Sequence, residues 1–101
     1  MSWIDIADLS ELKQAQKLCI PSGTTSILLF WWKETAHAVE NQCSHAFKKL
    51  DGGTFENGII QCPFHGARFC VETGEHLSPP AFKGIKRFET RIEGNKIQIK
   101  P

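Results

Sequence analysis

The sequence has no tyrosine, a single methionine and only four cysteines among its 101 residues. It also lacks a long apolar run, because the longest one, residues 27–32, is far too short to span a bilayer. The first residues show no basic stretch followed by an apolar one, as a secretion signal would. We therefore expect a soluble, cytoplasmic protein.

Neither sign of charge is in excess. Twelve basic residues stand against eleven acidic ones, which gives a formal net charge of +1. A nucleic-acid footprint or a polybasic membrane tether requires a clear surplus of lysine and arginine. We expect neither nucleic acid nor a membrane as a partner, but other proteins, and we expect the chain itself to be a monomer.

The length allows one small domain, residues 1–101, and leaves no room for a second catalytic domain. A chain of this size buries only about two-thirds of its unfolded surface. A metal centre that ties two loops together would therefore add useful stability.

Two short segments carry one cysteine and one histidine each. The first is Cys43-Ser44-His45, the second is Cys62-Pro63-Phe64-His65-Gly66, and 16 residues separate them. Two thiolates on one iron and two imidazoles on the other are the ligand set of a Rieske [2Fe-2S] cluster, in which histidine raises the reduction potential. Gly66 would let the backbone fold tightly under such a cluster.

The same ligand types also suit a Cys₂His₂ zinc site. Zinc fingers commonly place both cysteines in one knuckle and both histidines in the other. Here each segment mixes the two types. The mixed arrangement favours the iron-sulfur cluster, and a structural zinc-binding module stays as an alternative.

Residues 41–80 resemble a Rieske domain, and weaker similarity extends over the whole chain. The run Cys62-Pro63-Phe64-His65-Gly66-Ala67-Arg68-Phe69 resembles the Rieske-type ferredoxins of bacterial aromatic-ring-hydroxylating dioxygenase systems of the biphenyl, naphthalene or carbazole type. The resemblance implies an all-β Rieske fold, with antiparallel sheets in a sandwich and a cluster-binding subdomain, about residues 41–80, at one tip. It also implies one [2Fe-2S] cluster, whose ligands are Cys43, His45, Cys62 and His65.

Departures from the wider family indicate the branch. High-potential Rieske proteins of respiratory complexes carry two further cysteines that link the ligand loops, and here those positions are Lys48 and Phe64. That branch also has a serine and a tyrosine that donate hydrogen bonds toward the cluster sulfurs, where this chain has Ala67 and Phe69. Losing such donors destabilises the reduced state, so we expect a potential near the bottom of the Rieske range, about −150 mV.

The resemblance implies an electron-transfer component and not an enzyme. Oxygenase subunits with a similar N-terminal domain need on the order of several hundred further residues for a mononuclear iron and a substrate pocket. The implied partners are a flavoprotein ferredoxin reductase as electron donor and a terminal Rieske oxygenase as acceptor. A Rieske-like small subunit of another oxidoreductase, such as nitrite reductase, is a further alternative.

In the family, the thiolates face the protein interior and the imidazoles lie at the tip near solvent. The resemblance therefore makes His45 and His65 the port through which electrons enter and leave. A small apolar contact patch is expected around them, formed by Phe47, Lys48, Phe64, Pro79 and Pro80.

The remaining two cysteines and two histidines are not expected to bind the cluster. Cys19 is predicted to be a small buried strand residue, and Cys70 to lie on the strand that leaves the second ligand segment, away from the irons. His37 is expected to be solvent-facing or hydrogen-bonded, on the strand face opposite its two alanine neighbours. His76 is expected near the docking surface.

Short apolar stretches between Gly, Pro and Asn predict an antiparallel all-β domain. Strands are expected over residues 3–6, 16–20, 26–32, 36–40, 59–62 and 67–71, followed by a hairpin over 88–99 that turns at Gly94-Asn95. A turn or short helix is expected over residues 10–14, with Ser10 as its N-cap. Because neighbouring strand residues point to opposite faces, one of Trp31 and Trp32 should lie in the core and the other be partly exposed.

Overall fold

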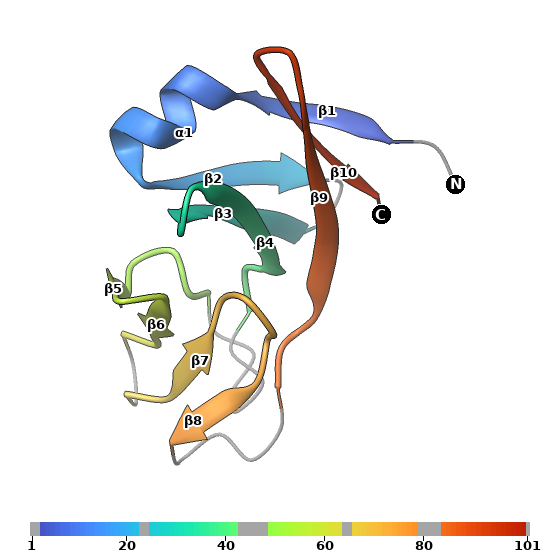
Figure 1. Ribbon diagram of the computed structural model, residues 1–101. Helices are drawn as coiled ribbons and strands as arrows, with labels where there is room; N and C mark the ends of the chain where they lie inside the picture. Colours follow the sequence, from blue (N-terminus) through green and yellow to red (C-terminus); the bar gives the residue numbers. More distant parts are fainter. Residues whose placement is uncertain (1–2, 23–24, 43–48, 64–65, 79–83, 101) are drawn as a thin grey trace.

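The computed structural model describes residues 3–22, 25–42, 49–63, 66–78 and 84–100. Within these ranges, ten strands form two antiparallel sheets, and the chain has one short helix, α1 (Leu9–Ala15) (Figure 1). The large sheet has the order β1 (Ile4–Asp8), β10 (Lys96–Lys100), β9 (Arg87–Glu93), β4 (Thr35–Glu40), β3 (Thr25–Trp32) and β2 (Lys17–Ser22). The small sheet has the order β5 (Thr54–Glu56), β6 (Ile59–Gln61), β7 (Arg68–Cys70) and β8 (His76–Ser78). The predicted all-β fold is confirmed.

The small sheet is formed by one continuous stretch of chain. The chain leaves the large sheet after β4, forms all four strands of the small sheet, and returns as β9, which pairs with β4 through Ala38 opposite Phe88 and Val39 opposite Arg87. Just beyond this pairing, the Glu40 N–H donates to the Lys86 carbonyl at 2.9 Å. The segment that leaves the large sheet after β4 and the segment that returns to it before β9 are therefore adjacent at this point.

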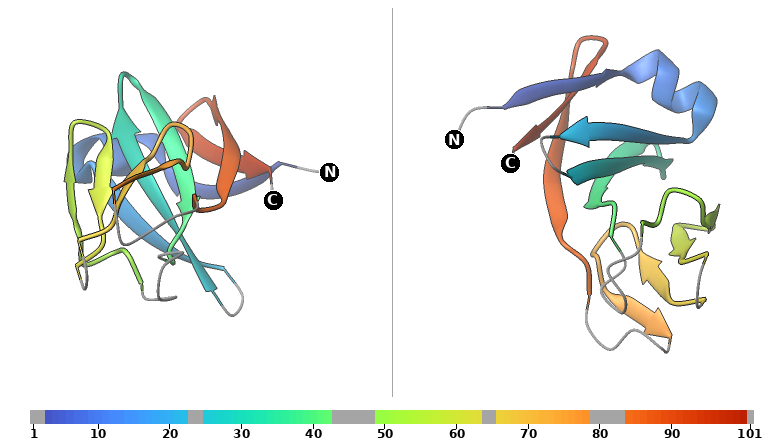
Figure 2. Two further views of the ribbon diagram at one scale, coloured as in Figure 1. Left: turned by 90° about the horizontal axis from the view of Figure 1, so that it is seen from below. Right: turned by 180° about the vertical axis from the view of Figure 1, so that it is seen from behind.

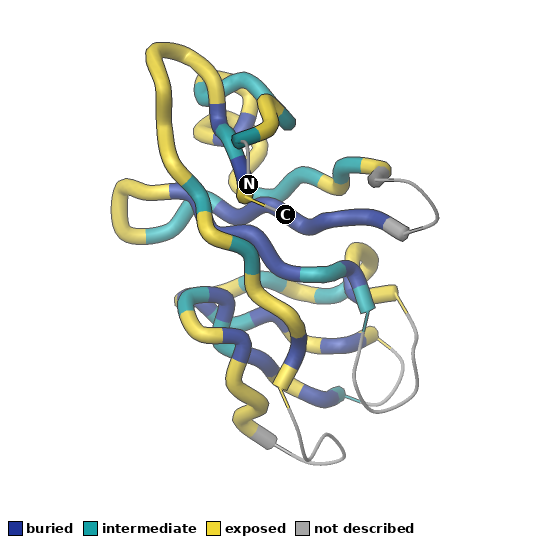
Figure 3. The backbone as a smooth tube through the Cα atoms, turned by 90° about the vertical axis from the view of Figure 1, so that its right-hand side faces the viewer, coloured by how far each residue is buried: buried dark blue, intermediate teal, exposed yellow. Residues whose placement is uncertain are grey.

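Strand β3 is buried on both faces. Its residues Ile27, Leu28, Leu29 and Phe30 are all 3% exposed or less, and successive side chains of a strand point to opposite sides. Leu28 and Phe30 pack in the core toward the small sheet, whereas Ile27 and Leu29 pack in a second core with Leu12 of α1. The tube coloured by burial shows buried, dark blue segments running through the middle of the molecule (Figure 3).

The two cores lie on opposite sides of the β2–β4 layer. Seen from behind, α1 lies at one end of the molecule and β8 at the other (Figure 2). The core toward the small sheet contains Leu28, Phe30, Val39, Leu50, Ile60, Cys62, Ala67, Phe69, Val71 and Ile85. The base of the predicted metal site is therefore part of this core.

The β3–β4 hairpin forms as predicted, with a two-residue turn at Lys33 and Glu34. Both residues have positive φ, 54° and 60°, as the twist of a tight hairpin requires. The prediction for the tryptophans was wrong in part, because Trp31 and Trp32 are both half-buried. Both faces of β3 are covered, so Trp31 packs against the core that contains Leu12 and Trp32 packs against Phe55.

Two further expectations need correction. The helix begins at Leu9 with Asp8 in the N-cap position, so Ser10 lies inside the helix and is not its cap. Strand β2 continues through Pro21, which an edge strand tolerates because one row of its N–H groups faces outward. The C-terminal hairpin is confirmed, with Ile97 buried, but Ile92 opposite it is 39% exposed.

Candidate metal centre

The second predicted ligand segment connects β6 to β7. The Cys62 N–H donates to the Ala67 carbonyl at 2.7 Å, and the Gly66 N–H donates to the Cys62 carbonyl at 3.1 Å. Gly66 has φ 75°, where a side chain would cost about 1–2 kcal/mol. Cys62 is 1% exposed and belongs to the core with Phe69. This interior position agrees with the one expected for a thiolate ligand.

The first predicted ligand segment is anchored at both ends by Asn41. This residue is 3% exposed. Its side-chain Oδ1 accepts the N–H of Leu50 at 2.7 Å and the N–H of Asp51 at 2.9 Å. The segment between these anchor points contains the predicted ligands Cys43 and His45, which lie outside the described residues. No role was predicted for Asn41 from the sequence. The signal that could have indicated one is a polar residue between an apolar strand and a predicted ligand segment.

Residues 50–53, here called the return strap, bring the chain back from the first ligand segment toward β5. A Cβ on Gly53 would clash with the carbonyl oxygen of Gln61, and a Cβ on Gly52 would lie 3.8 Å from Pro63 Cγ. The strap therefore lies directly against the start of the second ligand segment. The chain that returns from the first segment and the chain that enters the second therefore lie side by side at one end of the small sheet.

The segment that carries Pro79 and Pro80 also starts from this end. The Ile85 N–H donates to the Gly74 carbonyl at 2.8 Å, which holds the chain after this segment against the turn between β7 and β8. His76 is exposed on β8, and Leu77 beside it is 48% exposed. The predicted ligand His65 and the expected contact patch of Phe47, Lys48, Phe64, Pro79 and Pro80 lie outside the described residues.

Among the other cysteines and histidines, Cys19 contradicts its prediction. It is exposed, because β2 is the edge strand of the large sheet and leaves this side chain uncovered. Cys70 lies half-buried at the end of β7, on the strand that leaves the second ligand segment, as expected. His37 is buried, with its Nε2 3.1 Å from the Trp32 carbonyl, so the hydrogen-bonded alternative is confirmed. In the described part of the chain, no three His, Cys, Asp or Glu side chains gather as a metal site.

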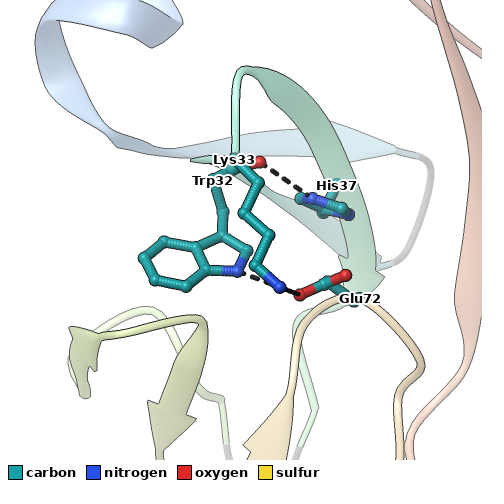
Figure 4. A network of polar contacts seen from close by, with 4 residues as sticks. All are labelled: Trp32, Lys33, His37 and Glu72. Carbon is teal, nitrogen blue, oxygen red and sulfur yellow. Dashed lines mark hydrogen bonds and ion pairs between the residues drawn. The ribbon is translucent and has the colours of Figure 1, made fainter.

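A polar network lies at the opposite end of the small sheet (Figure 4). The Trp32 Nε1–H donates to Glu72 Oε1 at 3.0 Å, and Lys33 Nζ lies 3.2 Å from the same oxygen. The hydrogen bonds from Lys33 and then Trp32 lower the pKa of the Glu72 carboxyl. Burial lowers the pKa of the neighbouring His37. The network joins the tip of the β3–β4 hairpin to the turn after β7.

Comparison with known families settles the class of this site. A family model described as "Rieske [2Fe-2S] domain" matches residues 2–89. The chain belongs to this family. Its cofactor is accordingly one Rieske-type [2Fe-2S] cluster, and the match favours the cluster over the zinc alternative.

Relatives of this Rieske protein match along nearly its whole length. The ferredoxin component of the naphthalene 1,2-dioxygenase/salicylate 5-hydroxylase systems of Ralstonia sp is 30% identical over 99 residues, which cover 98% of this chain and 95% of the relative. The biphenyl dioxygenase ferredoxin subunit of Pseudomonas sp. (strain KKS102) is 26% identical over 100 residues, covering 98% and 92%. The predicted resemblance to dioxygenase ferredoxins is confirmed, and the chain is an electron carrier and not itself a catalyst.

The solved structures show the same fold. The ferredoxin of carbazole 1,9a-dioxygenase from Nocardioides aromaticivorans IC177 superposes with a TM-score of 0.90 at 26% identity, covering 100% of this chain and 99% of that one. The Sphingomonas yanoikuyae B1 ferredoxin superposes with a TM-score of 0.89 at 22% identity, covering 99% of each chain. In the described residues, the chain forms no helix long and apolar enough to cross a membrane.

The residues in place fit the cluster. Cys62 presents its thiol from a tight loop in the interior, and Leu50 and Phe69 of the same core are fully buried. An apolar lining of this kind keeps water away from the sulfurs and so controls the potential of the centre. When bound, the cluster takes up and releases a single electron.

Proposed function

We propose that this protein carries single electrons from a flavin-dependent ferredoxin reductase to the terminal Rieske oxygenase of an aromatic-ring dioxygenase system in the cytoplasm. The names of its relatives support this, because they are ferredoxin components of naphthalene and biphenyl dioxygenase systems. A solved complex of reduced oxygenase and oxidized ferredoxin in carbazole 1,9a-dioxygenase includes a chain of the same fold, with a TM-score of 0.88.

The proposed ligands are Cys43, His45, Cys62 and His65, within a single domain, residues 1–101, whose cluster-binding subdomain covers about residues 41–80. The observation that carries this proposal is the position of Cys62. It is buried at the start of the second segment, and that segment lies against the strap that returns from the first. The contact between this strap and the start of the second segment supports a common site for the four proposed ligands.

The chain's own residues tune the proposed carrier. Ala67 and Phe69 are fully buried in the core with Cys62, and neither has a hydroxyl to donate to a cluster sulfur. Hydrogen bonds to sulfur stabilise the reduced state, so a centre without these two donors has a lower potential. A low potential suits a carrier that passes electrons on to a second Rieske centre.

Electron exchange would take place at the imidazole side of the site. His45 and His65 are the proposed port, with Phe47, Lys48, Phe64, Pro79 and Pro80 as the surrounding contact patch. The exposed Leu77 on β8 adds apolar surface next to this region. Small redox interfaces of this kind form and separate quickly, as a carrier that visits two partners requires.

Electron paramagnetic resonance of the dithionite-reduced protein, purified without added metal, tests the proposal. We expect a rhombic signal whose average g value lies below that of all-cysteine [2Fe-2S] ferredoxins, together with iron and acid-labile sulfide in equal amounts. An EPR-silent protein that contains zinc would overturn the electron-carrier function. Reduction of a purified Rieske oxygenase by the reduced protein, followed by stopped-flow absorbance, then tests the proposed acceptor.

A further inference from the structure

Asn41 uses every hydrogen-bonding position of its side chain. Oδ1 accepts the N–H groups of Leu50 and Asp51, and Nδ2 donates to Ser26 Oγ at 2.8 Å and to Cys19 Sγ at 3.5 Å. A backbone N–H can only donate, so the amide has a single possible orientation. Asn41 thereby fixes the start of the return strap to strands β2 and β3 of the large sheet.

Lys17 holds the other side of the same strap. From β2 its Nζ donates to the carbonyl of Asp51 at 2.8 Å and to the carbonyl of Gly53 at 3.0 Å. Hydrogen bonds from a charged donor are stronger than neutral ones. The strap closes on itself through the Gly53 N–H, which donates to the Leu50 carbonyl at 2.8 Å. Asn41 thus binds the N–H groups of Leu50 and Asp51, and Lys17 binds the carbonyls of Asp51 and Gly53.

The strap transmits this position to the second ligand segment. Gly53 packs so closely on Gln61 that no side chain fits between them, and Gly52 lies in ordinary contact distance of Pro63. Because closely packed backbone cannot shift without displacing its neighbour, the strap acts as a spacer between the large sheet and the segment that begins at Cys62.

Resting on the proposed ligand set, we propose that Asn41 and Lys17 are positioning residues for the cluster. Neither is a ligand. Together they fix the return strap against the second ligand segment, and the strap in turn sets the separation between the two cysteine-histidine pairs. Without the hydrogen bonds from either residue, the strap is held less firmly and the separation between the two cysteine-histidine pairs varies more. The distribution of cluster geometries is then broader, and the cluster is released faster.

The experiment compares holoprotein variants for the rate of cluster release to an excess of iron chelator and for the EPR line widths of the reduced state. Asn41→Leu keeps the branched shape of the side chain but removes all its hydrogen bonds, and Asn41→Asp restores the two acceptor contacts to the strap. Because the two hydrogen bonds to the strap are lost, we expect Asn41→Leu to speed cluster release on the order of thirtyfold. Lys17→Met keeps the apolar stem and removes the charged donor, and we expect a smaller acceleration of the same kind.

Thr90→Val is the matched control. Thr90 Oγ1 donates to the Ala36 carbonyl at 2.7 Å inside the large sheet, so this variant loses one side-chain hydrogen bond away from the strap. We expect wild-type release and wild-type line widths for Thr90→Val. We expect broadened EPR lines for Asn41→Leu and Lys17→Met, and narrower lines again for Asn41→Asp.

The outcomes separate cleanly. Cluster release and line widths in Asn41→Leu and Lys17→Met equal to those of Thr90→Val would overturn the positioning role. If Asn41→Leu does not fold, Lys17→Met decides by itself, because Lys17 is only partly buried. A wild-type protein without a Rieske EPR signal would overturn the proposed function and this inference with it, whereas a normal wild-type signal with unaffected variants overturns the inference alone.

Discussion

The indole N–H of Trp32 donates to the carboxylate of Glu72 at 3.0 Å. This hydrogen bond links the two sheets at the end of the small sheet opposite the predicted ligand segments. The same indole meets the Phe55 ring edge to face, with ring centroids 6.4 Å apart, and the Phe55 ring packs at a tilt of 42° against Phe30, with centroids 4.5 Å apart. Glu72 lies on the turn after β7 (Figure 4). The small sheet is therefore fastened at both ends, by this contact and by the return strap.

Replacing Trp32 should weaken the attachment of the small sheet. Trp32→Ala removes the packing on Phe55 and the hydrogen bond to Glu72, and we expect a loss of about 2–3 kcal/mol in the free energy of unfolding, since large aromatic truncations cost this order. Trp32→Phe keeps a ring on Phe55 and should lose much less. Urea unfolding followed by circular dichroism measures both, and equal losses in the two variants would contradict the packing argument.

The Glu72 carboxylate should make stability depend on pH at the acid end. Hydrogen bonds from Lys33 and Trp32 hold its pKa below the ordinary 4.5 in the folded state. The unfolded chain therefore binds the proton first as the pH falls, so this contribution is complete above pH 4.5 and is lost below it. The side chain is partly exposed, so the effect should also shrink with added salt. Urea midpoints measured from pH 6 downward should fall less steeply in Glu72→Gln than in wild type.

His37 should add a second pH dependence near neutrality. Burial lowers the pKa of His37 below 6.5. The hydrogen bond to the Trp32 carbonyl and the charge of Glu72 raise this pKa, whereas the charges of Arg87 and Lys33 lower it further. Because the unfolded chain takes up the proton more readily, the stability present above pH 6.5 should decrease as the pH falls through and below that value.

His37→Gln tests this second dependence. The variant should show a flatter urea midpoint between pH 8 and pH 5.5 than wild type. His76→Gln serves as control, because His76 is exposed on β8. A His76→Gln profile as flat as that of His37→Gln would show that burial of His37 is not the cause.

Two adjacent glycines of the return strap should respond very differently to alanine. A Cβ on Gly53 would clash with the backbone oxygen of Gln61, whereas a Cβ on Gly52 meets Pro63 Cγ at an ordinary 3.8 Å. Overpacking against backbone costs about 1–3 kcal/mol or more. We expect Gly53→Ala to lose cluster content and stability, and Gly52→Ala to stay within about 0.5 kcal/mol of wild type. Iron per chain and urea midpoints measure the difference; equal behaviour of both would contradict the close contact at Gly53.

The sequence pattern predicted the two hairpins of neighbouring strands correctly. The β3–β4 hairpin and the C-terminal hairpin formed at their expected positions, because alternation and a short turn specify a hairpin without help from distant residues. The burial of Cys19 was predicted from its apolar neighbours and was wrong. Whether a strand lies at the edge of a sheet depends on pairing with distant segments, which the neighbours of Cys19 do not encode. The same limit applied to the two tryptophans.

The sequence by itself determined the family and its cofactor, because the spacing and types of four side chains predict a Rieske ligand set and the matching family model spans residues 2–89. Tertiary structure alone decided how the ligand segments are held. Asn41 and Lys17 reach residues 9 to 36 positions away in the chain, and Trp32 reaches Glu72 across 40. Such contacts arise only when the small sheet packs on the large one, since a hydrogen bond depends on distance and direction in space and leaves no periodic trace in the order of residues.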